Sequence, residues 1–191
     1  MTEATDAPLA PPDLEFRPVT PERWPDLAAL FDGRGGPKYC WCMVWRPWPE
    51  GVERSRPNKR AEMERTVLGG TPVGILAYVE GEPVAWCSVA PRETYRKLGG
   101  DEYPDGTNVW SIVCFFAQRP QRGRGITSRL LDAACAEASA AGADVIEAYP
   151  VDPDSPSYKF MGVLSNFLDA GFEETGRVGK RRHVMRRWLR S

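Results

Sequence analysis

Histidine is nearly absent from this sequence, and no set of residues is spaced like a complete metal site. His183 is the single histidine among 191 residues, and the five cysteines are unevenly spread. A structural zinc site normally needs four nitrogen or sulfur ligands, and Cys40-Trp41-Cys42 supplies two at most. We therefore expect no metal. Three cysteines sit in apolar runs, as reduced thiols of cytosolic proteins do, so we expect a cytoplasmic protein.

An excess of one charge and a long apolar run are also missing. The chain has 25 basic and 26 acidic residues and a formal net charge of −1, which argues against nucleic acid as a partner but leaves room for a local basic patch. No stretch approaches the roughly 18 apolar residues of a membrane span, so no membrane partner is expected. Residues 1–12 lack the basic-then-apolar order of a signal peptide. We expect a disordered tail there and a single domain over 13–191.

The sequence does contain an ordered series of strand and helix patterns without an internal repeat. A crossover unit, strand–helix–strand, covers residues 108–151, so its two strands should run parallel, whereas hairpins on either side imply a mixed sheet. Thr20 and Asn58 are the expected caps of the first two helices. The patterns predict strands at 14–19, 73–79, 84–89, 108–117 and 145–151, two more around Gly179, and later helices after Gly125 and over 160–170.

The segment Gln121-Arg122-Gly123-Arg124-Gly125-Ile126-Thr127 joins a buried strand to an amphipathic helix. Glycines at such a junction let backbone N–H groups turn inward, where they add to the unpaired N–H groups and positive dipole of the helix start. The neighbouring arginines favour a ligand with two or more phosphate charges. The spacing fits neither a nucleoside triphosphate loop nor a dinucleotide fingerprint. A Gly-rich turn that merely starts a helix is the alternative.

This segment resembles the Gln/Arg-x-x-Gly-x-Gly/Ala signature of the GNAT acetyltransferase superfamily, with Thr127 at the final small position. Phe167-Leu168-Asp169-Ala170-Gly171-Phe172 is similar to the family's helix-to-strand junction, and the order of elements also matches. The resemblance implies an α/β fold with a mixed, mostly antiparallel sheet and helices on both faces. A central parallel strand pair would splay around the acyl-CoA site.

The resemblance also implies an activity: transfer of an acetyl group from acetyl-CoA to a primary amine of a small molecule, by direct attack in a ternary complex. The alternatives are a sensor that binds acyl-CoA without turnover, and acyl transfer to a protein amine. Residues implied in acetyl-CoA binding are Phe115, Phe116 and Ala117, along the pantetheine arm, and Arg122, Gly123, Arg124, Gly125, Ile126 and Thr127, around the pyrophosphate. The Thr127 hydroxyl would cap the helix or meet a phosphate.

Direct attack needs a neutral amine, and an ammonium with a pKa of about 10.4 is neutral in only about one molecule in 10³ near pH 7. We therefore expect a base or a water relay for the amine and a proton donor for the leaving thiolate. Many family members have a tyrosine donor at the position of Phe167, which has no proton to give. Tyr158 and Ser165 are the candidate donors, and Glu147 is the candidate base. Tyr149 is expected on the same face of the same strand, and Asp152, at the end of the strand, is another candidate base.

Each of these residues also has a non-catalytic interpretation, such as a tyrosine that closes the core or a carboxylate that faces solvent. Cys114 is expected to be a buried thiol and His183 to be exposed or structural. The run Lys180-Arg181-Arg182 could meet the nucleotide 3′-phosphate, an acidic acceptor or only solvent. Tyr39, Trp41, Trp45 and Trp48 either pack beneath a long loop or form an amine pocket. The acceptor, the acyl length and the oligomeric state, a homodimer included, stay open.

Overall fold

The computed structural model describes residues 13–189, so the tail predicted for residues 1–12 lies outside the described residues. Within 13–189 the strands form one seven-stranded sheet in the order β1-β2-β3-β4-β5-β7-β6. β4 and β5 run parallel, and the other neighbouring strands are antiparallel. The predicted mixed sheet and its parallel crossover are confirmed. The strands are β1 (Glu15–Pro18), β2 (Ile75–Val79), β3 (Glu82–Pro91), β4 (Val109–Ala117), β5 (Val145–Ala148), β6 (Glu173–Val178) and β7 (Arg182–Trp188).

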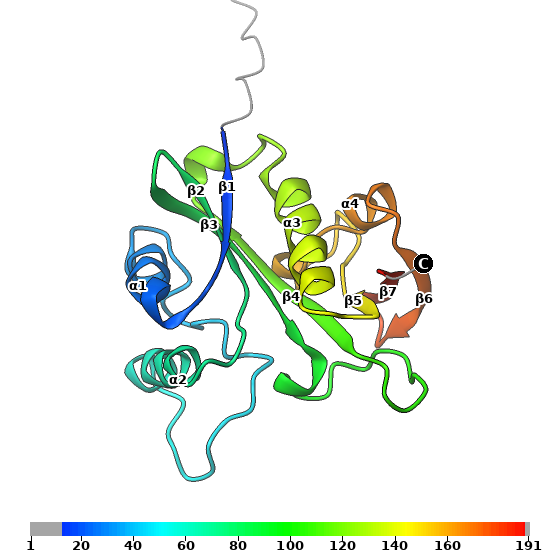
Figure 1. Ribbon diagram of the computed structural model, residues 1–191, viewed down its shortest axis with the longest axis horizontal. Helices are drawn as coiled ribbons and strands as arrows, with labels where there is room; N and C mark the ends of the chain where they lie inside the picture. The colour runs from blue at the N-terminus through cyan, green and yellow to red at the C-terminus, as the bar shows by residue number, and fades with distance from the viewer. Residues whose placement is uncertain (1–12, 190–191) are drawn as a thin grey trace, which may run out of the picture.

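Helices cover both faces of this sheet, as predicted. In Figure 1, α1 and α2 lie on one side of the central strands, and α3 and α4 lie on the other. No helix in the described part of the chain is both long and apolar enough to cross a membrane. The α-helices are α1 (Trp24–Asp32), α2 (Arg56–Leu68), α3 (Ile126–Ala140) and α4 (Leu164–Asp169), and short 3-10 helices span Pro21–Arg23, Arg92–Thr94, Arg119–Gln121 and Lys159–Met161.

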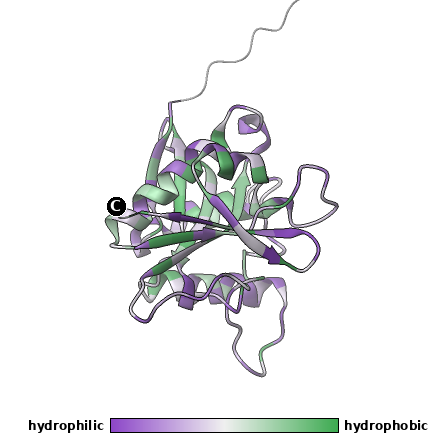
Figure 2. Cartoon of the chain, turned by 90° about the vertical axis from the view of Figure 1, so that its right-hand side faces the viewer, coloured by the Kyte–Doolittle hydropathy of each residue, from purple (hydrophilic) through white to green (hydrophobic). Residues whose placement is uncertain are grey.

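Each face of the sheet has its own hydrophobic core. Along β2, Leu76 and Tyr78 pack toward α1 and α2, whereas Ile75 and Ala77 pack toward α3. This is the alternation expected of a strand buried on both faces. Figure 2 shows the resulting distribution, with hydrophobic residues concentrated between sheet and helices and hydrophilic residues along the loops.

β4 contains a bulge at Val113. Ser88 of β3 pairs with Cys114 and Val89 pairs with Ile112, so Val113 is the extra residue. As a result the consecutive residues Val113 and Cys114 both pack into the core beneath α1 and α2. A bulge bends its strand and increases the local twist. β4 therefore bends at this point, while it stays paired with β3 as far as Ala117.

Two helix caps differ from the prediction. α2 starts at Arg56 because Ser55 is its cap, with the Asn58 N–H donating to Ser55 Oγ at 3.4 Å. Ser55 competes successfully because a proline follows at the start of the helix, which suits the first turn. Thr20 makes no side-chain cap hydrogen bond. Its hydroxyl instead bonds the Glu22 carboxylate, and this hydrogen bond lowers the pKa of Glu22.

The helix predicted over residues 160–170 is shorter in the structure, because Gly162 has a φ of +97° and interrupts it. After Gly162 the chain runs alongside Val151, which follows β5. The Val151 N–H donates to the Gly162 carbonyl at 3.1 Å, and the Leu164 N–H donates to the Val151 carbonyl at 3.0 Å. The opposite edge of Val151 faces β7, where Val151 pairs with Arg182. Residues 162–164 thus lie on the β4 side of the β5 extension.

Candidate active site

The turn between β4 and α3 has the backbone geometry of an anion site. Gly123 and Gly125 have φ angles of +72° and +71°, a region that favours glycine, and open space lies where a Cβ would be at either position. Gly125 is the N-cap of α3 and makes no side-chain cap hydrogen bond, and the capping or phosphate role of Thr127 stays a prediction. The first N–H groups of the fifteen-residue helix point along its axis toward the turn.

Beside this turn, one edge of β4 has no strand partner among the described residues. The β4–β5 ladder ends at Ile112 and Ala148, and residues 113–117 of β4 continue past it. The Gln118 N–H donates to Val84 of β3, so the backbone groups of Ala117 point the other way. The Ala117 carbonyl accepts a hydrogen bond from Arg122 Nε at 2.9 Å. The two parallel strands therefore diverge just before the glycine turn, beyond the bulge.

Phe115, Phe116 and Ala117 are half-buried, and Arg122 is exposed. The structure thus brings the residues predicted to bind acetyl-CoA together along one edge and one turn.

On the face of the sheet that α1 and α2 cover, three connections and the start of β7 meet around Tyr158. Its ring centroid is 6.4 Å from that of Trp45. The Arg182 guanidinium carbon lies 4.7 Å from the Trp45 ring centroid and 5.7 Å from that of Tyr158. Arg182 Nη1 also donates to the Leu98 carbonyl at 3.2 Å. Tyr158, 36% exposed with a φ of +62°, lines a cavity of about 380 Å³ together with residues 178–182.

Glu147 is fully buried at the centre of a hydrogen-bond network. Oε1 accepts from the Asp101 N–H and the Tyr103 hydroxyl, each at 2.9 Å. Oε2 accepts from Arg92 Nη1 at 3.1 Å and the Tyr149 hydroxyl at 2.7 Å. Burial, reinforced by this carboxylate, raises the pKa of both tyrosines, so they stay protonated donors. A carboxylate has about four acceptor sites, and all are used, so a base role would require the covering segment to open.

Ser165, the other candidate donor, is exposed on α4. Phe167, at the family's tyrosine position, is fully buried and packs edge-on against Phe115 and Phe172. Of the three predicted catalytic residues, Tyr158 alone lines a cavity on the α1–α2 face, whereas Glu147 is enclosed and Ser165 faces solvent.

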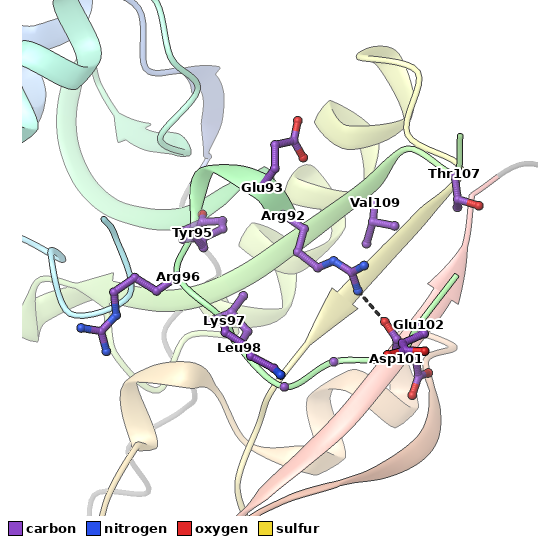
Figure 3. A pocket seen from close by; sticks show the side chains of 12 residues that line it. Arg92, Glu93, Tyr95, Arg96, Lys97, Leu98, Asp101, Glu102, Thr107 and Val109 are labelled. Carbon is purple, nitrogen blue, oxygen red and sulfur yellow. Dashed lines mark hydrogen bonds between the residues drawn. The ribbon is translucent and has the colours of Figure 1, made fainter. Parts of the chain in front are cut away.

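A second cavity of about 410 Å³ lies under the connection between β3 and β4 (Figure 3). Its wall is held by Arg92, whose Nη1 donates to the Asp101 carbonyl at 2.7 Å. The lining includes Val109, the first residue of β4, whereas the glycine turn follows the last. A nine-residue strand spans about 26 Å or more, so this cavity extends well away from the turn.

Other candidates from the sequence have structural roles. A hydrogen bond with Cys42 and burial raise the pKa of the Cys114 thiol well above its ordinary value, so it is a poor nucleophile. His183 is buried, not exposed, and lies between Glu174 at 2.8 Å and Asp152 at 3.1 Å. Trp41 is fully buried beneath its loop, while Tyr39 is exposed. Residues 13–189 contain no group of three or more His, Cys, Asp or Glu side chains placed to hold a metal.

The sequence did not reveal that the Arg182 guanidinium lies over the Trp45 ring. Nor did it reveal that Arg92 and Tyr103 both hydrogen-bond the Glu147 carboxylate. No local pattern carries this information, because the partners come from separate connections. Arg182 and Leu98, for example, are 84 positions apart.

A glycine turn beside a diverging parallel strand pair is the arrangement that the GNAT resemblance implies for an acyl-CoA site. The acetyltransferase (GNAT) family model matches residues 38–162. The chain belongs to the GNAT acetyltransferase family, as its signature predicted. No curated protein matched the sequence.

Solved structures show the same fold at low identity. A ribosomal-protein-alanine N-acetyltransferase from Brucella melitensis is 20% identical with a TM-score of 0.54, covering 91% of this chain and 99% of its own. A Salmonella typhimurium protein, yncA, solved with acetyl-CoA, is 15% identical with a TM-score of 0.55 and coverages of 94% and 95%. An aminoglycoside acetyltransferase in complex with coenzyme A is 17% identical with a TM-score of 0.58 and coverages of 92% and 95%.

Proposed function

We propose that this protein transfers the acetyl group of acetyl-CoA to a primary amine of a small molecule, by direct attack within a ternary complex. The turn after β4 is the observation that carries the proposal. Two left-handed glycines, the second of them the N-cap residue, lead into α3 beside an open edge of β4. This arrangement suits a diphosphate at the turn and an extended pantetheine arm along the strand.

The residues that would bind the donor follow from this arrangement. Backbone groups of Phe115, Phe116 and Ala117 would hydrogen-bond the pantetheine arm. The N–H groups of Gly123, Gly125, Ile126 and Thr127 would hold the pyrophosphate, with Arg122 and Arg124 supplying positive charge. The Arg122 contact with the Ala117 carbonyl would be exchanged for contacts with the ligand.

The reaction requires two proton movements at the thioester. The acceptor nitrogen attacks the carbonyl carbon, the C–N bond forms, and the C–S bond breaks. The attacking nitrogen gives up a proton to a water relay, because the Glu147 carboxylate is enclosed. The leaving thiolate accepts a proton from the Tyr158 hydroxyl. The high pKa of Cys114 supports direct attack over an acyl-cysteine route.

Cavity size supports a small acceptor. The two cavities near the β5 extension and the β3–β4 connection are about 380 and 410 Å³, within the range of small-molecule pockets. Among the similar folds, one protein is named for a ribosomal protein and another for aminoglycosides. Transfer to a protein amine is therefore tested in parallel.

The test is an acetyl-CoA thiol-release assay over a panel of small amines and of peptides with free N-termini or lysines. Binding of acetyl-CoA is measured separately by calorimetry. We expect saturable binding and turnover with at least one small amine. Absence of binding at millimolar acetyl-CoA would end the proposal, and turnover confined to peptides would replace the small acceptor with a protein.

The burial of Phe167 favours a second candidate, a sensor that binds acyl-CoA without turnover, because the family's usual phenol is missing. Tyr158→Phe separates the two. As the thiolate's proton donor, Tyr158 should contribute on the order of 10²-fold to kcat, while the Kd for CoA should change less than twofold. Tyr39→Phe, another exposed tyrosine, is the control. Any turnover by the native chain excludes the sensor, and equal kcat for Tyr158→Phe removes Tyr158 from the mechanism.

A further inference from the structure

The tip between β6 and β7 carries three consecutive cations, Lys180-Arg181-Arg182, and no carboxylate of residues 13–189 lies within ion-pair distance of them. Two other arginines of the same hairpin do face acids: Arg177 lies 3.6 Å from Glu174, and Arg186 lies 3.9 Å from Asp101. Adjacent like charges repel, so a bound anion would stabilise this tip.

These cations surround a cavity. The hollow of about 380 Å³ is lined by Tyr158 and residues 178–182. Its volume lies within the range of pockets for small organic molecules. Polar recognition in it comes from cationic side chains and one phenol, which suits a small ligand with negative charge.

Arg182 is built into the wall of this cavity. Its guanidinium is half-buried, covered by the rings of Trp45 and Tyr158, and one nitrogen is fixed by the Leu98 carbonyl. A guanidinium has five N–H donors, so others are available for a two-pronged contact with a carboxylate or phosphate. Burial lowers the pKa of Arg182, and a neighbouring anion would favour its charged form.

The cavity lies on the acceptor side of the sheet. Trp45 and Val178 pack in the core beneath α1 and α2, whereas Ile126 and the rest of α3 pack in the opposite core. The nucleotide end of acetyl-CoA is expected at the turn before α3. The cations at the hairpin tip are therefore positioned for the acceptor, across the sheet from the nucleotide.

We propose that the acceptor is an amine that also carries a carboxylate or phosphate group, and that Arg182, assisted by Lys180 and Arg181, binds this group. The inference rests on the proposed function, since it names the substrate class of the same site. An acceptor of this kind is a small amino acid or amino phosphate in its chemistry.

The first test needs no activity. The full-length protein is titrated with succinate and, separately, with inorganic phosphate at constant ionic strength, while NMR follows the Trp45 indole and Arg182 guanidinium N–H signals. At least one probe should give a saturable shift, and the better probe distinguishes a carboxylate site from a phosphate site. Lys180→Gln/Arg181→Gln should weaken binding at least tenfold. Arg17→Gln/Arg65→Gln removes the same charge at exposed arginines of β1 and α2 and should not weaken binding.

The second test measures kcat/KM for acceptor pairs that share an amine and differ only in carboxylate against carboxamide, or phosphate against alcohol. The anionic member should be preferred at least tenfold, and the cavity double variant should lose this preference while CoA affinity is retained. Equal use of both members, or no saturable shift with either probe, would overturn the inference. Failure to bind acetyl-CoA would instead refute the proposed function, and the anion titration would still decide this site.

Discussion

The two sides of the proposed transfer site are built by different means. The donor side consists of main-chain groups: two left-handed glycines, a helix start and a strand edge, all within residues 115–127. The acceptor side consists mainly of side chains from segments far apart in sequence, represented by Trp45, Tyr158 and Arg182, with the Leu98 carbonyl fixing Arg182. Main-chain N–H groups are the same whatever side chain a residue carries, so many sequences can build the acetyl-CoA side. The acceptor, in contrast, is selected by the identity of the side chains. Mutations should therefore separate the two sides.

The largest effect is expected at Glu147, which holds the acceptor-side framework. Glu147→Ala removes the carboxylate that faces Arg92 and leaves the hydroxyls of buried Tyr149 and half-buried Tyr103 without this acceptor. We expect the free energy of unfolding to fall by about 3 to 5 kcal/mol, as measured by urea denaturation. Glu173→Ala, at an exposed carboxylate, should cost less than about 0.5 kcal/mol. Equal losses in the two variants would contradict the network.

Alkaline pH should weaken the same side through Tyr95. Burial raises its pKa from 10.0 to about 12, and its hydroxyl meets Ser88 and Arg46. Because folding raises the pKa of Tyr95, the contribution of its hydroxyl to the free energy of unfolding is complete below pH 10 and is lost as pH rises toward 12. The loss is roughly 2 to 3 kcal/mol, at about 1.4 kcal/mol per pH unit.

Denaturation of the native chain and Tyr95→Phe from pH 9 to 12 measures this difference. The variant should show the shallower decline, and parallel curves would refute the assignment.

On the donor side, Gly125→Ala should act on ligand affinity. The added methyl group enters open space at the turn and a φ of +71°, so acetyl-CoA affinity should fall about tenfold, or about 1.4 kcal/mol. Gly70→Ala carries the same backbone strain at +77° with equally open surroundings. Both variants should lose about 1 kcal/mol of stability, but calorimetry should find weaker binding in Gly125→Ala alone. A similar loss of acetyl-CoA affinity in both variants would show that the turn has only a structural role.

The smallest effect is expected at Ser165, because its side chain faces solvent on α4. Ser165→Ala should change kcat less than twofold in the thiol-release assay, with Tyr158→Phe run alongside. A loss greater than tenfold would transfer the donor role to Ser165.

Sequence reasoning performed well where structure is encoded locally. The glycine turn, the amphipathic α3 and the crossover between β4 and β5 all follow from short-range pattern, and the structure has each of them. It was weaker where neighbours compete, as when Ser55 rather than Asn58 caps α2. The predicted helix over 160–170 includes Gly162, but this glycine has a left-handed φ. That φ accompanies the hydrogen bond from Val151 to Gly162, a tertiary contact that the local pattern does not reveal.

The candidate catalytic residues could be suggested from the sequence but their surroundings could not. That Glu147 would be enclosed depends on residues 92–103 folding over β5, which no periodicity reveals. Likewise, Arg182 reads as a surface charge in sequence and becomes part of a cavity wall only when Trp45 is brought to it.

The extra residue at Val113 changes the phase of β4. Before it, Trp110 and Ile112 face the α3 core; beyond it, Phe115 and Ala117 do, so even positions give way to odd ones. Deleting Val113 would join Ile112 directly to Cys114 and restore regular alternation, so Phe115 and Ala117 would still face α3 and Phe116 would still face α1. Because no remaining side chain would change face, such a deletion would act only through the lost bend and added twist of the strand, and it would show whether that bend keeps β4 apart from β5 beyond Ile112.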